Sequence, residues 1–191
     1  MSQRVIAFTG ISGVGKTTFL SKLAELITFQ HVTGGSLIAA ARAIAPGSRD
    51  TMRHADLDEN QRLLIQGFYR ARDPDAGLIV MDGHVVVDTG EGLTKISSDV
   101  FKALDVMAMV HLEADPSRIA QNRSRDSSRS RPKSEIETLK MHQDASRRHA
   151  SFIADSLKID FLIVGQGDVS SLANRLTVGF DDAMPTKTQQ I

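Results

Sequence analysis

The chain has 191 residues, equal numbers of basic and acidic side chains (23 each), no cysteine and 41% hydrophobic residues. This length predicts a single globular domain that buries enough apolar surface to fold without disulfides. The formal net charge of zero argues against a protein that coats nucleic acid or binds an acidic membrane surface. Without cysteine, a disulfide framework and a thiolate zinc site are excluded.

No apolar run approaches the roughly 20 residues that a membrane-spanning helix needs. The N-terminus leads directly into the first predicted strand and shows no signal-peptide pattern. We therefore expect a cytoplasmic protein, without a membrane partner, that acts as a monomer or a small homo-oligomer.

The first predicted strand, Val5–Phe8, is followed by a glycine-rich segment and then by a helix. The segment Gly10–Thr17, hereafter the P-loop, reads GISGVGKT and matches the phosphate-binding pattern G-x-x-x-x-G-K-[ST]. Backbone N–H groups of such a loop, together with the helix N-terminus, bind anionic oxygens. In this pattern Lys16 reaches the outer phosphates of a nucleoside triphosphate, and Thr17 offers its hydroxyl to Mg²⁺.

Apolar strands and helices alternate through the rest of the chain. After the helix at Thr17–Leu26, we expect in chain order a strand at His31–Thr33, helices at Leu37–Ile44 and Asp58–Arg72, and strands at Leu78–Met81, Val106–Leu112 and Ile159–Val164. Continuous apolar strands separated by helices predict an α/β fold, with a parallel sheet covered on both faces. Such a sheet binds ligands at the carboxyl ends of its strands.

Two polar segments interrupt this alternation. Asp88–Lys95 is rich in glycine and is expected to form a loop. Residues 121–134 are rich in serine and arginine and contain Arg123, Arg125, Arg129 and Arg131. Arginine binds phosphate through two parallel hydrogen bonds, so this segment fits a lid that closes over phosphates and excludes water. A solvated loop and a nucleic-acid-binding patch are the alternatives.

Three further residues are candidates for the acceptor side of a transfer reaction. Asp82 ends the strand at Leu78–Met81, where a carboxylate can hold Mg²⁺ or orient the acceptor; capping a turn is its alternative role. His84 lies two residues further on, and a packed or surface histidine is the alternative. Arg53 could bind an acceptor phosphate, although an exposed surface arginine is the simpler interpretation of this residue alone. Arg147 and Arg148 lie in a further predicted helix that begins at Glu135. They could belong to the site or to an exposed basic face of that helix.

Together these residues resemble the nucleoside monophosphate kinases, and most closely the short archaeal-type adenylate kinases. The resemblance extends from Arg4 to about Leu176. It is carried by Thr9–Thr18, Arg49–Arg53, Val80–His84, Glu113–Asp115 and the arginines of residues 121–134.

The resemblance implies a P-loop NTPase fold with three layers (α/β/α) around a five-stranded parallel sheet. It implies one kinase domain over residues 1–180, with a monophosphate-binding helical insert at about 34–72 and a lid at about 121–134. The remaining residues, 181–191, are polar and are expected to form a loose tail. The implied reaction converts ATP and AMP into two ADP in the presence of Mg²⁺, with no nucleic acid as partner.

The resemblance also implies a set of site residues. The ATP phosphates would be bound by Gly10, Ser12, Gly13, Val14, Gly15, Lys16, Thr17 and Thr18. Thr17 and Asp82 would hold Mg²⁺. Ser36, Arg53 and His84 would bind the monophosphate. The residues acting on the transferred phosphoryl group would be Lys16, Asp82, Arg123, Arg129 and Arg131.

The chain departs from the family pattern in two places. Gly34-Gly35-Ser36 has two glycines where the family has one, and we expect it to form a turn. Val85–Lys95 lacks the proline-rich sequence of the archaeal enzymes. Both lie where the acceptor would bind, so a modified nucleotide, a sugar or a 5′-hydroxyl stays open as acceptor. A nucleotide-dependent switch or assembly ATPase stays open as well, as does a nucleic-acid binder using Arg123–Arg131.

Overall fold

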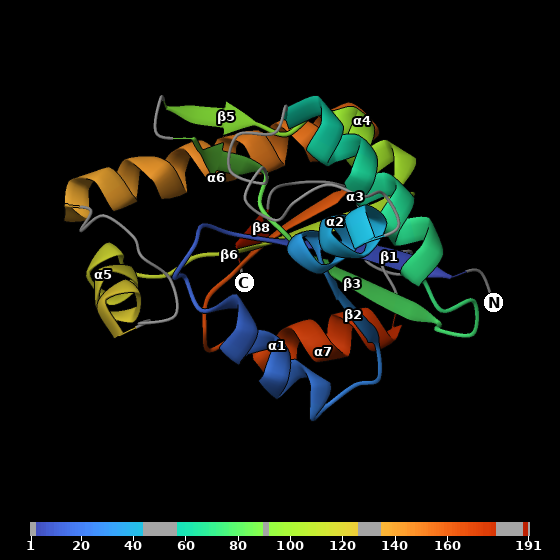
Figure 1. The fold of residues 1–191 in the computed structure, drawn as a ribbon. Helices are drawn as coiled ribbons and strands as arrows, with labels where there is room; N and C mark the ends of the chain where they lie inside the picture. Colours follow the sequence, from blue (N-terminus) through green and yellow to red (C-terminus); the bar gives the residue numbers. More distant parts are fainter. Residues whose placement is uncertain (1–2, 44–56, 90–91, 126–134, 179–188, 191) are drawn as a thin grey trace.

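A computed structural model describes residues 3–43, 57–89, 92–125, 135–178 and 189–190 of the chain. A parallel sheet lies at its centre and is covered by helices on both faces (Figure 1). In spatial order its strands are β2 (Gln30–Thr33), β3 (Leu78–Asp82), β1 (Arg4–Thr9), β6 (Val106–Leu112), β7 (Asp160–Val164) and β8 (Gln189–Gln190). The predicted α/β fold with five parallel strands is thus confirmed, and β8 adds a sixth strand at the edge.

The two residues of β8 lie in the tail 181–191, for which we expected no regular structure. Leu162 and Ile163 of β7 pair in parallel with Gln189 and Gln190. These two residues therefore form a short strand pair with β7, and the other residues of the tail lie outside the described part of the chain. The polar side chains of Gln189 and Gln190 carry no strand signal, because the pairing depends on an exposed edge of β7 that is distant in sequence.

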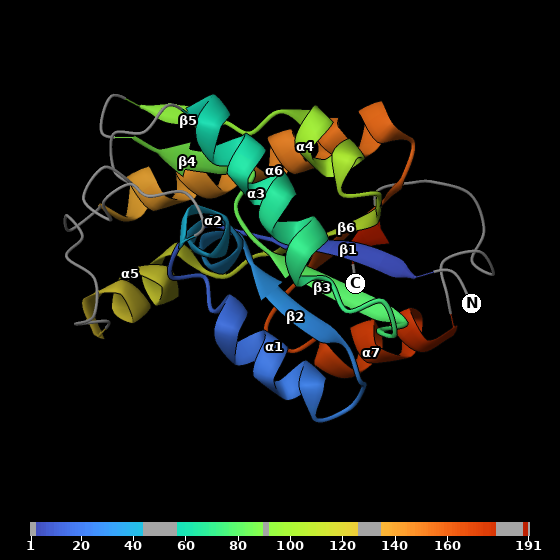
Figure 2. The same ribbon diagram turned by 45° about the vertical axis from the view of Figure 1, so that its right-hand side comes forward.

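Seven helices are described, and they divide between the two faces of the sheet. They are α1 (Lys16–Ala24), α2 (Gly34–Ala43), α3 (Leu57–Ala71), α4 (Ser98–Ala103), α5 (Pro116–Arg125), α6 (Ile136–Leu157) and α7 (Val169–Val178). Helices α1 and α7 lie together on one face, whereas α3, α4 and α6 lie on the other (Figures 1 and 2). Among these helices, none is both long enough and apolar enough to cross a membrane.

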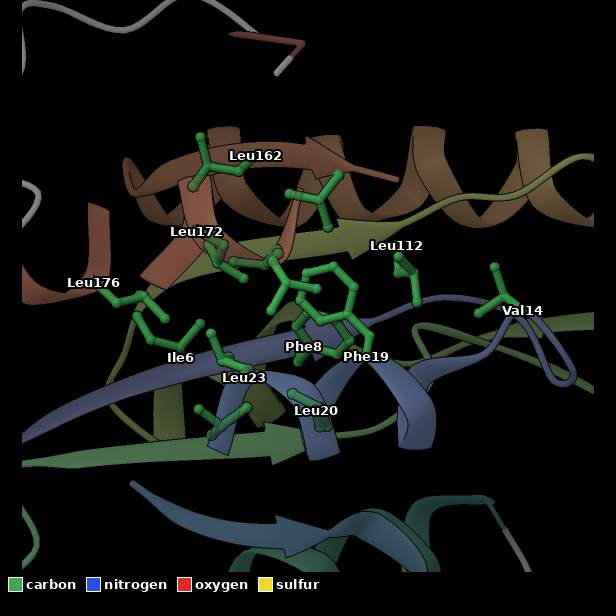
Figure 3. Close-up of a cluster of buried hydrophobic side chains, with 14 of the residues drawn as sticks. Ile6, Phe8, Val14, Phe19, Leu20, Leu23, Leu112, Leu162, Leu172 and Leu176 are labelled. Carbon is green, nitrogen blue, oxygen red and sulfur yellow. The ribbon is translucent and has the colours of Figure 1, made fainter. Parts of the chain in front are cut away.

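The central strands are apolar on both faces because each face packs against helices. On the α1 side, Phe8 of β1 and Phe19 of α1 have ring centroids 5.2 Å apart, and Leu23 is fully buried beside them (Figure 3). Each fully buried side chain of this size contributes about 1.5–3 kcal/mol to stability. This core holds the start of α1, and with it the P-loop, firmly against β1.

Residues 88–95 do not form the simple loop that we expected. Strand β4 (Val86–Asp88) pairs with β5 (Leu93–Lys95) in an antiparallel arrangement, with Val87 opposite Thr94. Gly92 has a φ of 140°, which glycine adopts without strain. The strands are too short for their alternation to stand out in a polar, glycine-rich sequence.

Candidate active site

The carboxyl ends of β1, β2 and β3 open onto one cleft with a volume of about 960 Å³. The P-loop lines one side of the cleft, and α2, α3 and α4 line the other. Asp82, the last residue of β3, also lines the cleft, as do Gly83 and His84, which follow it. The cleft is at the edge of the sheet where we expected the ligand from the sequence.

The P-loop has the backbone conformation that its glycines allow. Gly13 and Gly15 have φ values of 87° and 103°, in the left-handed region that favours glycine. Six predicted ATP-binding residues line the cleft: Ser12, Gly13, Gly15, Lys16, Thr17 and Thr18. Gly10 and Val14 do not line it. Val14 is 1% exposed and packs in the core, so its contribution to a site would come from its backbone.

The carbonyl oxygen of Gly10 connects the P-loop with the segment after β3. It accepts hydrogen bonds from Nζ of Lys16 and from Nδ1 of His84, both at 2.9 Å. Because a carbonyl oxygen only accepts, Nδ1 of His84 carries the proton in this contact. Lys16 and His84 thus bind the same backbone carbonyl oxygen, and both side chains line the cleft.

Asp82 is the last residue of β3 and lies between two basic side chains. Its carboxylate oxygens are each 3.8 Å from nitrogen atoms, one from Nζ of Lys16 and the other from Nε2 of His31. His31 comes from β2, the neighbouring strand, and the sequence provided no signal for it. The contact exists only because β2 and β3 pair in parallel, with His31 opposite Val80.

Thr17 and Asp82 provide the oxygen donors that Mg²⁺ prefers. Both line the cleft, and the Asp82 side chain is 13% exposed. Within the described ranges, no group of three or more His, Cys, Asp or Glu side chains forms a metal cage.

Ser36, a predicted acceptor-binding residue, is engaged in capping α2. Its backbone N–H donates to Oγ1 of Thr33 at 3.1 Å, and its hydroxyl donates to the Thr33 carbonyl at 2.8 Å. Thr33 therefore acts as the N-cap residue. Gly34 and Gly35 are the first residues of the helix and line the cleft, so the expectation that they form a turn was wrong.

Seven apolar side chains line the part of the cleft that lies outside the P-loop. We call it the acceptor chamber; its apolar lining residues are Ile38, Leu64, Met81, Val87, Ile96, Val100 and Phe101. Two amides of α3, Asn60 and Gln61, complete it. The Asn60 side-chain oxygen accepts from Arg42 at 2.8 Å, and that of Gln61 accepts from the Ser97 N–H at 3.0 Å.

The predicted lid residues are only partly described. Arg123 lies in α5, and its Nε donates to the carbonyl oxygen of Ser12 at 2.8 Å. Arg125, at the end of α5, lines the cleft. The other predicted arginines of the site, Arg53, Arg129 and Arg131, lie outside the described residues.

Arg147 is held by two carboxylates rather than forming an exposed basic face. Its guanidinium lies 3.4 Å from Glu113 and 2.8 Å from Asp144. Burial raises the pKa of Glu113, and the charge of Arg147 opposes that shift. Arg148, the next residue, is exposed on α6.

A fully buried histidine lies at the end of β6, close to the P-loop. Nδ1 of His111 is 2.9 Å from the hydroxyl of Thr9, and Nε2 has no hydrogen-bond partner among the described residues. Burial, followed by the positive charges of Lys16 and Arg147, lowers the pKa of His111 to about 3. His111 is therefore neutral at physiological pH. Nothing in the local sequence distinguished it, because its burial depends on β1 and β7 on either side.

Comparisons with known proteins agree with this geometry. Residues 9–140 match the family model described as an AAA domain. The adenylate kinase of Pyrococcus abyssi is 32% identical over 166 residues, which cover 83% of this chain and 83% of that protein. The adenylate kinase of Sulfurisphaera tokodaii is 29% identical over 185 residues, covering 88% of this chain and 94% of that protein.

Solved structures show the same fold at low sequence identity. Shikimate kinase from Bacteroides thetaiotaomicron has a TM-score of 0.55 and 15% identity, and covers 93% of this chain and 98% of its own. Shikimate kinase from Acinetobacter baumannii in complex with shikimate has a TM-score of 0.53 and 16% identity, and covers 92% of each chain.

Proposed function

We propose that this chain, which belongs to the adenylate kinase family, transfers the γ-phosphoryl group of ATP to a nucleoside monophosphate. Its match to the AAA domain model agrees with a nucleotide-binding P-loop protein. The observation that carries the proposal is the single cleft that combines a phosphate-binding P-loop with an apolar acceptor chamber. Because the relatives are named adenylate kinases, AMP is the first acceptor to test, with two ADP as products.

The P-loop side of the cleft would hold the donor. Backbone N–H groups at the start of α1 bind the phosphate oxygens, and Lys16 exchanges the Gly10 carbonyl for an outer phosphate. The hydroxyl of Thr17 and the carboxylate of Asp82 would hold Mg²⁺, which when bound neutralises charge on the phosphates. ATP and Mg²⁺ are thus the cofactors that we propose.

The acceptor chamber fits the flat, apolar face of a nucleobase. Its seven apolar side chains would exclude water from the base, and the Asn60 and Gln61 side chains provide polar groups at its rim. A sugar or shikimate ring carries several hydroxyls and would leave most of them unpaired against these walls. The chamber therefore supports a nucleotide acceptor over a polyhydroxylated one.

The transfer itself needs positioning and charge neutralisation more than a strong base. An oxygen of the acceptor phosphate, already anionic near neutral pH, forms a new bond to the γ-phosphorus. The bond from that phosphorus to the β,γ-bridging oxygen breaks, and ADP leaves with the electron pair. Arg53 and His84 would orient the acceptor phosphate. The arginines of the 121–134 segment, Arg123, Arg129 and Arg131, would neutralise charge and exclude water.

The wider organisation that we propose follows from the same residues. Residues 1–180 form one kinase domain, in which α2 and α3 belong to the acceptor insert at 34–72. The protein acts in the cytoplasm, as a monomer or a small homo-oligomer, on a small nucleotide substrate.

A coupled assay that follows ADP formation from ATP and Mg²⁺ tests the proposal. The acceptors would be AMP, the other nucleoside monophosphates, shikimate, a hexose and an RNA with a 5′-hydroxyl, against a water-only background. We expect a nucleoside monophosphate to turn over far faster than the background. If none does, the proposal is wrong. Strong ATP hydrolysis without acceptor, unchanged in Arg53→Ala, would instead support the ATPase switch.

A further inference from the structure

Two side chains of α5 bind backbone carbonyl groups of the P-loop, and one of them, Asn122, also lines the cleft. Nε of Arg123 donates to the carbonyl oxygen of Ser12 at 2.8 Å, and Nδ2 of Asn122 donates to the carbonyl oxygen of Gly13 at 2.9 Å. Both acceptor atoms belong to peptide groups in the middle of the loop. Helix α5 therefore contacts the loop through specific hydrogen bonds.

Gln166, in the connection between β7 and α7, binds the next part of the loop. Its Nε2 lies 3.0 Å from the carbonyl oxygen of Val14 and 3.3 Å from that of Gly15. Four consecutive carbonyl oxygens of the P-loop, from Ser12 to Gly15, thus accept hydrogen bonds from side chains outside the loop.

These bonds fix the direction of the N–H groups on the other side of the loop. In a planar trans peptide the C=O of one residue and the N–H of the next point in opposite directions. The bonds to Ser12, Val14 and Gly15 therefore orient the N–H groups of Gly13, Gly15 and Lys16. The bond to Gly13 orients the Val14 N–H, which closes the turn by donating to Ile11 at 3.3 Å.

The two glycines inside the loop leave the space that these side chains occupy. A Cβ atom built on Gly13 would lie 2.7 Å from Cγ of Arg123, and one built on Gly15 would lie 2.5 Å from Nε2 of Gln166. Contacts this close require the neighbouring side chain to move. The absence of a side chain at Gly13 and Gly15 therefore leaves room for Arg123 and Gln166 beside the loop.

We propose that Gln166 and Asn122 are positioning residues for the triphosphate. They hold the P-loop in its anion-binding conformation before ATP arrives, so ATP binding does not have to order the loop. The assignment uses only the ATP-binding part of the proposed function and does not depend on the identity of the acceptor.

A role in binding the base of ATP is the competing explanation for Gln166, and a ligand without a base distinguishes the two. Inorganic tripolyphosphate with Mg²⁺ can contact the P-loop but offers no base or ribose. If Gln166 positions the loop, loss of its side-chain donor should weaken the binding of ATP and of tripolyphosphate by the same factor. A base contact predicts weaker ATP binding and unchanged tripolyphosphate binding.

The experiment is calorimetric titration of the full chain with Mg²⁺–ATP and with Mg²⁺–tripolyphosphate. Gln166→Leu and Asn122→Leu remove the donors, and Asn174→Leu, at an exposed position of α7 outside the site, is the matched control. We expect each of the first two variants to bind both ligands about tenfold more weakly, because Gln166→Leu removes the donor to the Val14 carbonyl and Asn122→Leu removes the donor to the Gly13 carbonyl. Asn174→Leu should bind like the wild type.

The assignment is overturned if Gln166→Leu binds each ligand with the same dissociation constant as the wild type. It is also overturned if Gln166→Leu loses affinity for ATP but not for tripolyphosphate. Thermal melting of each variant identifies any loss due to unfolding, and Asn122→Leu provides an independent test from a different element. A wild type that binds both ligands yet phosphorylates no monophosphate would refute the proposed function alone.

Discussion

Nζ of Lys16 lies 3.8 Å from Oδ1 of Asp82, which joins the first residue of α1 to the last residue of β3. The two side chains are 10% and 13% exposed, so little water screens the attraction between their charges. One residue belongs to the phosphate-binding loop and the other to the proposed magnesium site. Under the proposed function, their proximity would bring the donor phosphates and the Mg²⁺ ion to the same part of the cleft.

Lys16→Ala should lower the turnover number by about a hundredfold or more, because it removes a positive charge that stabilises the transferred phosphoryl group. The coupled assay with AMP, or with the best acceptor of the panel, measures this. Lys22→Ala changes an exposed lysine of the same helix and should retain wild-type turnover. Near-normal turnover in Lys16→Ala would show that the P-loop assignment is wrong.

Asp82→Asn should raise the Mg²⁺ concentration needed for half-maximal activity by about tenfold or more, because the amide is a weaker ligand than the carboxylate. A Mg²⁺ titration of the initial rate at saturating ATP measures this. Asp155→Asn, on the exposed side of α6, serves as the control. An unchanged Mg²⁺ requirement in Asp82→Asn would argue against a metal-binding role.

Arg53→Ala should raise KM for the acceptor by about tenfold while KM for ATP changes little, because only the acceptor phosphate would lose its charged partner. Initial rates with each substrate varied in turn separate the two constants. Arg70→Ala removes an exposed arginine of α3 and should change neither. An equal rise in both constants would contradict the role proposed for Arg53.

The buried neutral state of His111 predicts a loss of stability in acid. Burial lowers the pKa of His111 in the folded protein to about 3, whereas the unfolded chain has the ordinary value of 6.5. Between these values the unfolded state binds the proton first. The free energy of unfolding therefore falls as the pH drops from 6.5 toward 3, by up to about 1.4 kcal/mol per pH unit.

Urea denaturation at a series of pH values tests this through the variant His111→Gln. The free energy of unfolding of this variant should depend less steeply on pH than that of the wild type. If the free energy of unfolding depends on pH with the same slope in the wild type and in His111→Gln, His111 does not cause the loss of stability in acid.

Gly67→Ala should destabilise the crossing of α2 and α3. A Cβ at Gly67 would overlap the backbone carbonyl of Leu37, so the helices would have to separate. We expect a loss of about 1–3 kcal/mol in the free energy of unfolding, measured by urea denaturation. Gly77→Ala is the control, because a Cβ there meets no atom within 4 Å. A wild-type stability for Gly67→Ala would contradict close packing of the two helices.

The parts of the fold that local patterns encode were predicted well. The P-loop follows β1 and precedes α1, and Asp82 ends β3, as the spacing of apolar and glycine residues indicated. These features depend on backbone conformation and burial over fewer than about ten neighbouring residues, which periodicity reports directly. The short strand pair of β4 and β5 was not predicted, because three residues per strand show too little alternation of polar and apolar side chains.

The acceptor chamber shows where local patterns stop being informative. Its apolar side chains come from separate elements, including Ile38 of α2, Leu64 of α3 and Phe101 of α4. In the sequence each of them resembles an ordinary core residue. Only the crossing of α2 over α3 and the position of α4 turn these side chains toward a common space.

The amino-acid sequence alone was enough to identify a phosphate-binding loop, because the P-loop carries its binding groups in eight consecutive residues whose conformation its own glycines permit. What supports that loop, and what faces it, depends on the three-dimensional arrangement of the chain. Gln166 reaches Val14 across 152 positions, and His31 reaches Asp82 across a strand pair. Contacts of this kind leave no periodic trace in the chain, because they are set by the order in which strands pair and helices cover the sheet.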